Sequence, residues 1–157
     1  MNTLLIVVGK TDAKHIQTGI DEYVSRLKHY IPFDIKVIPD VKNVKNLSAE
    51  QQKVAEGKLI LAQLEPSDLV LLLDEGGKMF TSREFANHFV KISASGVKRL
   101  VFIIGGPYGF SQEVYAKANS KISLSPMTFS HQMVRMIFVE QLYRAQTIIK
   151  GEPYHHD

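Results

Sequence analysis

Short apolar runs recur along the chain, and they predict buried β-strands. Residues 3–8, 69–73 and 100–104 are rich in Val, Ile, Leu or Phe, and the first and last of these runs end abruptly at glycine. Runs of this length and composition are typical of strands that are covered on both faces. Residues 33–38 instead alternate between apolar and polar side chains, which predicts an edge strand with one wetter face. A smaller run, residues 122–124, predicts one more short strand.

Amphipathic stretches fill the intervals between these strands and predict helices. The first helix is expected from about Asp12. A second follows Ser48, which forms a capping-box pattern with Gln51 three residues later. Ser82 is expected to cap a third helix, and residues 131–150 predict a long final helix with a broad apolar stripe. A stripe that broad favours packing against the sheet and against a partner subunit.

Strands that alternate with helices predict an α/β fold, an open and mostly parallel sheet flanked by helices. No repeat or linker interrupts the sequence, so a single domain spanning residues 1–157 is expected. Glycines follow three of the predicted strands, at Gly9, within residues 74–78 and at residues 105–109. Because adjacent glycines let another group approach the backbone closely, these strand-end loops predict the rim of a small-molecule pocket.

The composition narrows the possible chemistry. The chain has no cysteine, which excludes thiolate catalysis, disulfides and cysteine-ligated metal sites and fits a cytoplasmic location. The amino terminus lacks a basic segment, and its apolar run is too short for a signal or a membrane span, so no membrane association is expected. The formal net charge of +3 permits an anionic partner but does not require one.

Three familiar motifs can be set aside. Gly9-Lys10-Thr11 is similar to the end of a phosphate-binding loop, but Leu4 stands where that motif needs a glycine. A dinucleotide fingerprint needs several glycines after the first strand, and Gly9 is alone there. The adjacent histidines of the tail rarely converge on one ion without further ligands, so no metal site is expected. From the residues alone, the prediction stops at an α/β domain with a small-molecule pocket.

One ordered set of motifs is more specific than any of its parts. The set comprises Gly9-Lys10, Leu73-x-x-x-Gly77-Lys78, Ile104-Gly105-Gly106-Pro107-x-Gly109, Leu124-Ser125-x-Met127-Thr128-Phe129-x-His131, Arg135, Glu140-Gln141-Leu142-Tyr143-Arg144-Ala145 and Pro153-Tyr154-His155. It covers essentially the whole chain and closely resembles the ribosomal RNA large-subunit methyltransferase H family, whose members are small single-domain SPOUT methyltransferases. The resemblance implies methylation of N3 of a pseudouridine in bacterial 23S ribosomal RNA with S-adenosylmethionine, a deep trefoil knot in the C-terminal part, and a homodimer that acts on the ribosome.

The resemblance also implies where the site lies. The catalytic candidates on the substrate side are in and near the C-terminal tail: Tyr154 to stack on or orient the base, His155 to accept a proton or hydrogen-bond the base, and Arg144 or Arg135 to hold phosphate. His131 is a weaker candidate. The residues expected against S-adenosylmethionine are Leu73, Gly105, Leu124, Ser125, Pro126, Met127, Thr128 and Phe129.

Two alternative functions remain open. One is a SPOUT methyltransferase that acts on transfer RNA or another ribosomal position, which the short length and the tail disfavour. The other is a non-catalytic module that binds a nucleotide or the ribosome, which the intact glycine loops and residues 124–129 disfavour. Turnover in the presence of S-adenosylmethionine separates the enzymes from the module.

Overall fold

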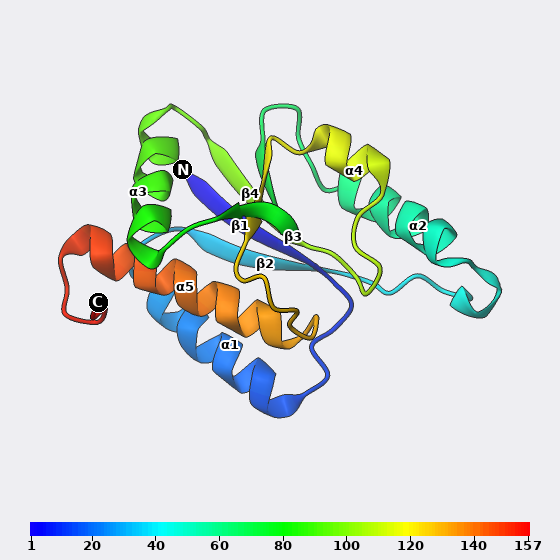
Figure 1. The fold of residues 1–157 in the computed structure, drawn as a ribbon, viewed down its shortest axis with the longest axis horizontal. Coiled ribbons are helices and arrows are strands. Elements are labelled where there is room, and N and C mark those ends of the chain that lie inside the picture. Colours follow the sequence, from blue (N-terminus) through cyan, green and yellow to red (C-terminus); the bar gives the residue numbers. More distant parts are fainter.

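The computed structural model describes residues 1–157 and shows a five-stranded sheet with helices on both faces (Figure 1). Neighbouring strands follow the order β2-β1-β4-β3-β5, and every pairing is parallel. This confirms the predicted α/β class, and β2 lies at an edge as its alternating pattern predicts. The strands are β1 (Asn2–Val8), β2 (Phe33–Ile38), β3 (Leu69–Met79), β4 (Arg99–Ile104) and β5 (Ser120–Ser123).

Helices α1, α3 and α5 cover one face of the sheet, and α2 and α4 cover the other (Figure 1). None of the helices is long and apolar enough to cross a membrane. The helices are α1 (Lys14–Leu27), α2 (Ala49–Leu61), α3 (Ser82–Ala94), α4 (Gln112–Lys117) and α5 (Met133–Lys150), with a 3-10 turn over Val44–Asn46.

Helices α2, α3 and α4 each begin after a hydroxyl side chain that caps the first turn. The Ser48 hydroxyl accepts from the Gln51 amide at 3.1 Å, and the Gln51 side chain accepts from the Ser48 amide at 2.9 Å, so the predicted capping box is confirmed. The cap of α3 is Thr81 and the expected cap at Ser82 is wrong, because Thr81 forms its own capping box with Glu84. The Ser82 hydroxyl is the first side chain inside the helix.

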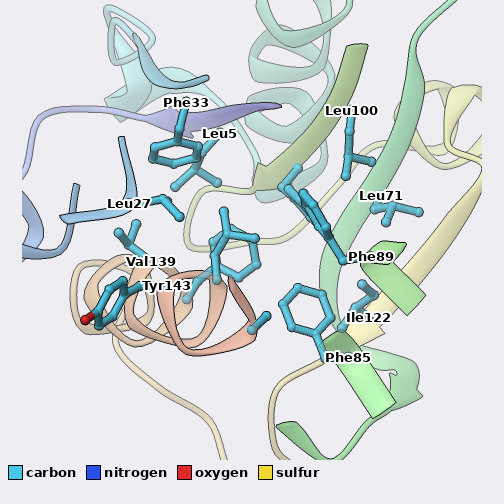
Figure 2. Packing of buried hydrophobic residues seen from close by; sticks show 14 of the residues in the cluster. Leu5, Leu27, Phe33, Leu71, Phe85, Phe89, Leu100, Ile122, Val139 and Tyr143 are labelled. Atoms are coloured by element: carbon cyan, nitrogen blue, oxygen red, sulfur yellow. The ribbon is translucent and has the colours of Figure 1, made fainter. Parts of the chain in front are cut away.

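The strand side chains alternate between two hydrophobic cores. The larger core lies between the sheet and α1, α3 and α5, and Figure 2 shows Leu5 and Leu71 of the sheet packed with Phe85 and Val139 of these helices. The smaller core lies under α2 and α4 and takes the alternate residues, such as Leu72. Burial on both faces explains why continuous apolar runs mark the central strands. It also gives the loops at the strand ends a rigid base.

Strand β3 is longer than its apolar run. The expected glycine loop over residues 74–78 is wrong, because β3 continues through this segment to Met79 and pairs with β5 again at Lys78 and Met79. The pairing shifts register along the way, since Ile122 is the partner of both Leu73 and Lys78. Gly77 permits the close approach, because a Cβ there would lie 2.6 Å from the Ile122 backbone nitrogen.

Candidate functional site

A cavity of about 530 Å³ opens where β3, β4 and β5 end. Ligand sites in parallel α/β sheets lie at the carboxyl ends of strands, and this volume is within the usual range for small-molecule sites. The cavity wall includes two carboxylates, Asp74 and Glu75, and contains no lysine or arginine. His131 is its only basic side chain. The charge of the cavity therefore suits a cationic ligand.

The cavity brings together three segments that are far apart in the sequence. They are the outer part of β3, the loop after β4 and the loop after β5. Pro126 lies in the last of these loops but does not line the cavity. Of the eight residues expected against the cofactor, the seven that line the cavity are Leu73, Gly105, Leu124, Ser125, Met127, Thr128 and Phe129.

The loop after β5, residues 124–129, is held by short hydrogen bonds. The Ser123 hydroxyl donates to the Ser125 carbonyl at 3.0 Å, and the Ser125 hydroxyl accepts from the Met127 amide at 2.9 Å. The Thr128 hydroxyl donates to Glu75 on β3 at 2.7 Å. Loop 124–129 is therefore fixed both internally and against the extension of β3.

The loop after β4, residues 105–109, presents bare backbone to the cavity. The Gly109 amide donates to the Gly106 carbonyl at 3.1 Å, which closes a tight turn, and Gly109 has a φ of 82° that favours glycine. Phe110 is buried beneath the turn, and a Cβ on Gly105 would lie 3.1 Å from its ring. We call residues 105–109 the glycine loop. A flat ligand can lie directly against it.

Arg135 is a buried structural residue. Its side chain is 2% exposed and donates to the carbonyls of Val8 at 2.7 Å, Gly9 at 2.8 Å and His131 at 3.1 Å. It also donates to the Thr11 hydroxyl at 3.0 Å. The guanidinium is used within the fold to join the first strand to the last helix, and the expectation that Arg135 holds phosphate is wrong.

The three predicted catalytic residues meet on α5 and the tail that folds back on it. Glu140 Oε1 accepts from Arg144 Nε at 3.0 Å and from the Tyr154 hydroxyl at 2.9 Å. The Arg144 guanidinium also lies 4.7 Å from the centre of the Tyr154 ring, and its Nη1 lies 3.2 Å from His155 Nδ1. We call Glu140, Arg144, Tyr154 and His155 the tail cluster.

The hydrogen bonds of the tail cluster define what each group can do. Burial and the bond to Glu140 raise the pKa of Tyr154, so the phenol keeps its proton. Burial would lower the pKa of Arg144, but Glu140 outweighs it and the pKa is raised. Because a guanidinium can only donate, His155 accepts at Nδ1, and its Nε2 donates to Asp157 at 2.8 Å. The tail cluster offers a fixed cation, a phenol and an imidazole.

The tail cluster does not line the cavity. Val134, in the first turn of α5, is the last residue of the cavity wall, and Arg144 follows ten residues later. At 1.5 Å and 100° per residue, Arg144 lies about 15 Å further along the axis of α5 and about 80° around it. The described chain therefore brings the predicted cofactor residues together and the predicted catalytic residues together, but as two separate sites.

Comparison with known proteins identifies the class of protein to which the chain belongs. Residues 1–155 match the family model described as "Predicted SPOUT methyltransferase", so the chain is a SPOUT methyltransferase. A probable methyltransferase from Bordetella pertussis shares the fold, with a TM-score of 0.53 and 11% identity over 92% of this chain and 94% of that chain.

Two curated relatives give the particular family. The ribosomal RNA large subunit methyltransferase H of Parabacteroides distasonis is 61% identical over 153 residues, which is 98% of each chain. The protein of the same name from Flavobacterium johnsoniae is 60% identical over 156 residues, which is 99% of each chain. The chain belongs to the ribosomal RNA large subunit methyltransferase H family.

SPOUT methyltransferases use S-adenosylmethionine, and the cavity fits this group. Its sulfonium and ammonium charges outweigh its single carboxylate, so a wall with Asp74 and Glu75 and no lysine or arginine is electrostatically suitable. These two acidic residues were not among the predicted site residues. The signal that could have found them is their position directly after the apolar run of residues 69–73. No group of three or more side chains that could hold a metal ion is present.

Proposed function

We propose that this protein transfers a methyl group from S-adenosylmethionine to N3 of a pseudouridine in bacterial 23S ribosomal RNA, on assembled ribosomes in the cytoplasm. The observation that carries the proposal is the acidic and apolar cavity at the ends of β3, β4 and β5, built from the residues of the family motif. The relatives named for ribosomal RNA large subunit methyl transfer, about 60% identical over the full chain, give further support.

The cavity residues would hold the cofactor by shape and charge. Leu73, Leu124 and Met127 provide an apolar slot for the adenine, and the glycine loop provides backbone against which it lies. When bound, S-adenosylmethionine would supply the methyl group on its sulfonium sulfur, and the methyl carbon is the atom that is attacked. The protein has to align that carbon with the acceptor nitrogen, so catalysis depends mainly on positioning.

The tail cluster would act on the base. N3 carries a proton that must leave for methyl transfer to occur, and the cationic Arg144 stabilises the negative charge that develops on the base as this proton departs ahead of the methyl group. Tyr154 keeps its own proton and therefore orients the base rather than deprotonating it. His155 accepts the N3 proton at Nδ1, the ring nitrogen that carries no hydrogen, after the substrate replaces Arg144 there.

We infer that the working enzyme is a homodimer in which the tail cluster of one chain meets the cavity of the other. The support is geometric, since none of the three catalytic candidates lines the cavity of its own chain. Reacting atoms must approach to about 3–3.5 Å, much less than the offset along α5. The apolar stripe of α5 extends to Ile149, which is 39% exposed and available to a partner.

We also propose that residues 1–157 act as one domain with a deep trefoil knot in its C-terminal part. The sheet order supports this proposal, because β4 and β5 flank β3 and the loops that follow them return to one cavity. The proposal follows the SPOUT class to which the chain belongs.

Transfer of a tritiated methyl group to ribosomes that lack the modification tests the function. Free large subunits are compared with assembled ribosomes, and the labelled nucleotide is then mapped. Label at N3 of a large-subunit pseudouridine is the expected result. Label at another ribosomal or transfer RNA position would assign a different SPOUT activity, and measurable cofactor binding without label on any RNA would favour a binding module.

A further inference from the structure

A buried carboxyl group without a charged partner lies beneath the glycine loop. Glu56 on α2 is 4% exposed. Its Oε2 accepts from the Gln52 side chain at 3.2 Å, and its Oε1 has no hydrogen-bond partner. Burying a carboxyl group in this way is unfavourable, because protein contacts do not replace the lost water. The fold itself gains little from this group.

The carboxyl group of Glu56 faces the backbone of Gly106. A Cβ on Gly106 would lie 2.5 Å from Oε1 and 2.7 Å from Oε2, so a larger residue here would have to displace the carboxyl group. Gly106 also lines the cofactor cavity, whereas Glu56 does not. One layer of backbone therefore separates the carboxyl group from the cavity. The next residue, Gly57, packs as closely on Ser111, where a Cβ would lie 2.5 Å from the hydroxyl, and this holds α2 in place.

The surroundings of Glu56 contain a negative charge and no paired cation. Burial raises the pKa of Glu56, the Gln52 amide lowers it, and the charge of Asp40 raises it, with a net increase. Its only side-chain partner is the neutral amide of Gln52. A cation that binds nearby would offset this repulsion and favour the ionised form.

We propose that Glu56 is a specificity-determining residue of the cofactor site, whose carboxylate acts across Gly106 to favour the cationic S-adenosylmethionine over neutral S-adenosylhomocysteine. This inference rests on the proposed function, since the second compound is what the first becomes on losing its methyl group. The two differ by that methyl group and by the sulfonium charge. Across about 10 Å at an effective dielectric of about 20, a unit charge changes binding on the order of tenfold. The product then leaves more readily than the cofactor.

Binding of both compounds to Glu56→Gln tests the inference by isothermal titration calorimetry. Glutamine keeps the shape and removes the charge. We expect S-adenosylmethionine to bind on the order of tenfold more weakly and S-adenosylhomocysteine to change by less than about threefold. Glu50→Gln is the matched control, because Glu50 is an exposed carboxylate on the same helix that pairs with Lys53 at 2.9 Å. Its two affinities should not change.

Other outcomes would overturn the role of Glu56. An unchanged ratio of the two affinities, whether both stay the same or both weaken equally, would show that the charge does not discriminate. Glu56→Met, which fills a similar volume with an apolar chain, gives a second measurement. Loss of S-adenosylhomocysteine binding in both variants would assign Glu56 to loop structure alone. A wild-type protein that does not bind S-adenosylmethionine would instead refute the proposed function.

Discussion

A heterodimer with a cavity defect on one chain and a tail-cluster defect on the other tests whether two subunits share each active site. One chain carries Leu124→Arg, which places a cation in a cavity wall that has no lysine or arginine and so opposes a cationic cofactor. The other carries Tyr154→Phe with His155→Ala. The two chains are co-expressed with different affinity tags, and the heterodimer is isolated by two successive purifications.

The expected magnitude follows from the geometry. Arg144 lies about 15 Å along α5 from Val134, while the reacting atoms must come within about 3–3.5 Å. If the cavity of one chain works with the tail of its partner, one site of the heterodimer carries both defects and the other carries neither. The heterodimer should then retain about half of the wild-type turnover. Each variant homodimer should lose about 100-fold or more.

Tritiated methyl transfer to ribosomes, measured per dimer, gives the result. A heterodimer of two differently tagged wild-type chains defines full activity. If each chain used its own tail, both sites of the mixed heterodimer would be defective. Turnover no higher than the mean of the two variant homodimers would refute a shared site.

Three further predictions concern single positions. Glu140→Gln should release the tail cluster and lower kcat at least about tenfold, while the Kd for S-adenosylmethionine, measured by calorimetry, stays unchanged. A change in Kd alone would contradict the assignment of the tail cluster to the substrate side. Gly77→Ala places a Cβ 2.6 Å from the Ile122 backbone. The substitution should lower the free energy of unfolding in urea by about 3 kcal/mol, and should weaken cofactor binding through its effect on loop 124–129. A normal urea midpoint would count against the close β3–β5 approach. Burial would raise the pKa of Asp68, but its hydrogen bonds, chiefly from Arg99, lower it on balance, so Asp68→Asn should cost about 3 kcal/mol at pH 7. This stabilisation is present above the unfolded carboxyl pKa of about 4 and is lost as pH falls through the lowered folded pKa. The difference in unfolding free energy between the wild type and Asp68→Asn should therefore shrink below about pH 4. A difference that does not depend on pH would refute the prediction.

The parts of the fold that local signals determine could be predicted from the sequence. Continuous apolar runs gave the central strands because both faces of the sheet are buried, and alternation over residues 33–38 gave the edge strand. The pairing of Ser48 with Gln51 predicted a helix start because both capping bonds form within four residues. The glycines after β4 predicted the position of the cavity, whereas Gly9 and the glycines within residues 74–78 do not line it.

Features that depend on distant partners could not be predicted. The extension of β3 exists because β5, more than forty residues later, pairs with it, and two adjacent glycines are equally typical of a loop. Arg135 and Glu56 look like surface residues of helices by composition, and only the packed structure shows that both are buried. The family motif predicted seven residues that line the cavity, and the meeting of the tail cluster with the cavity of a second chain stays a prediction.

The buried guanidinium of Arg135 has a consequence for when the enzyme becomes active during its synthesis. It bonds to the Val8 carbonyl, 127 positions earlier in the chain, so the ends of the protein meet only after α5 has been made. All three cavity segments precede α5, but Val134 of this helix completes the wall. A nascent chain still held in the exit tunnel has no finished cofactor site. Competence therefore requires that α5 has been made and has folded, and a chain terminated before this helix would lack a finished cavity.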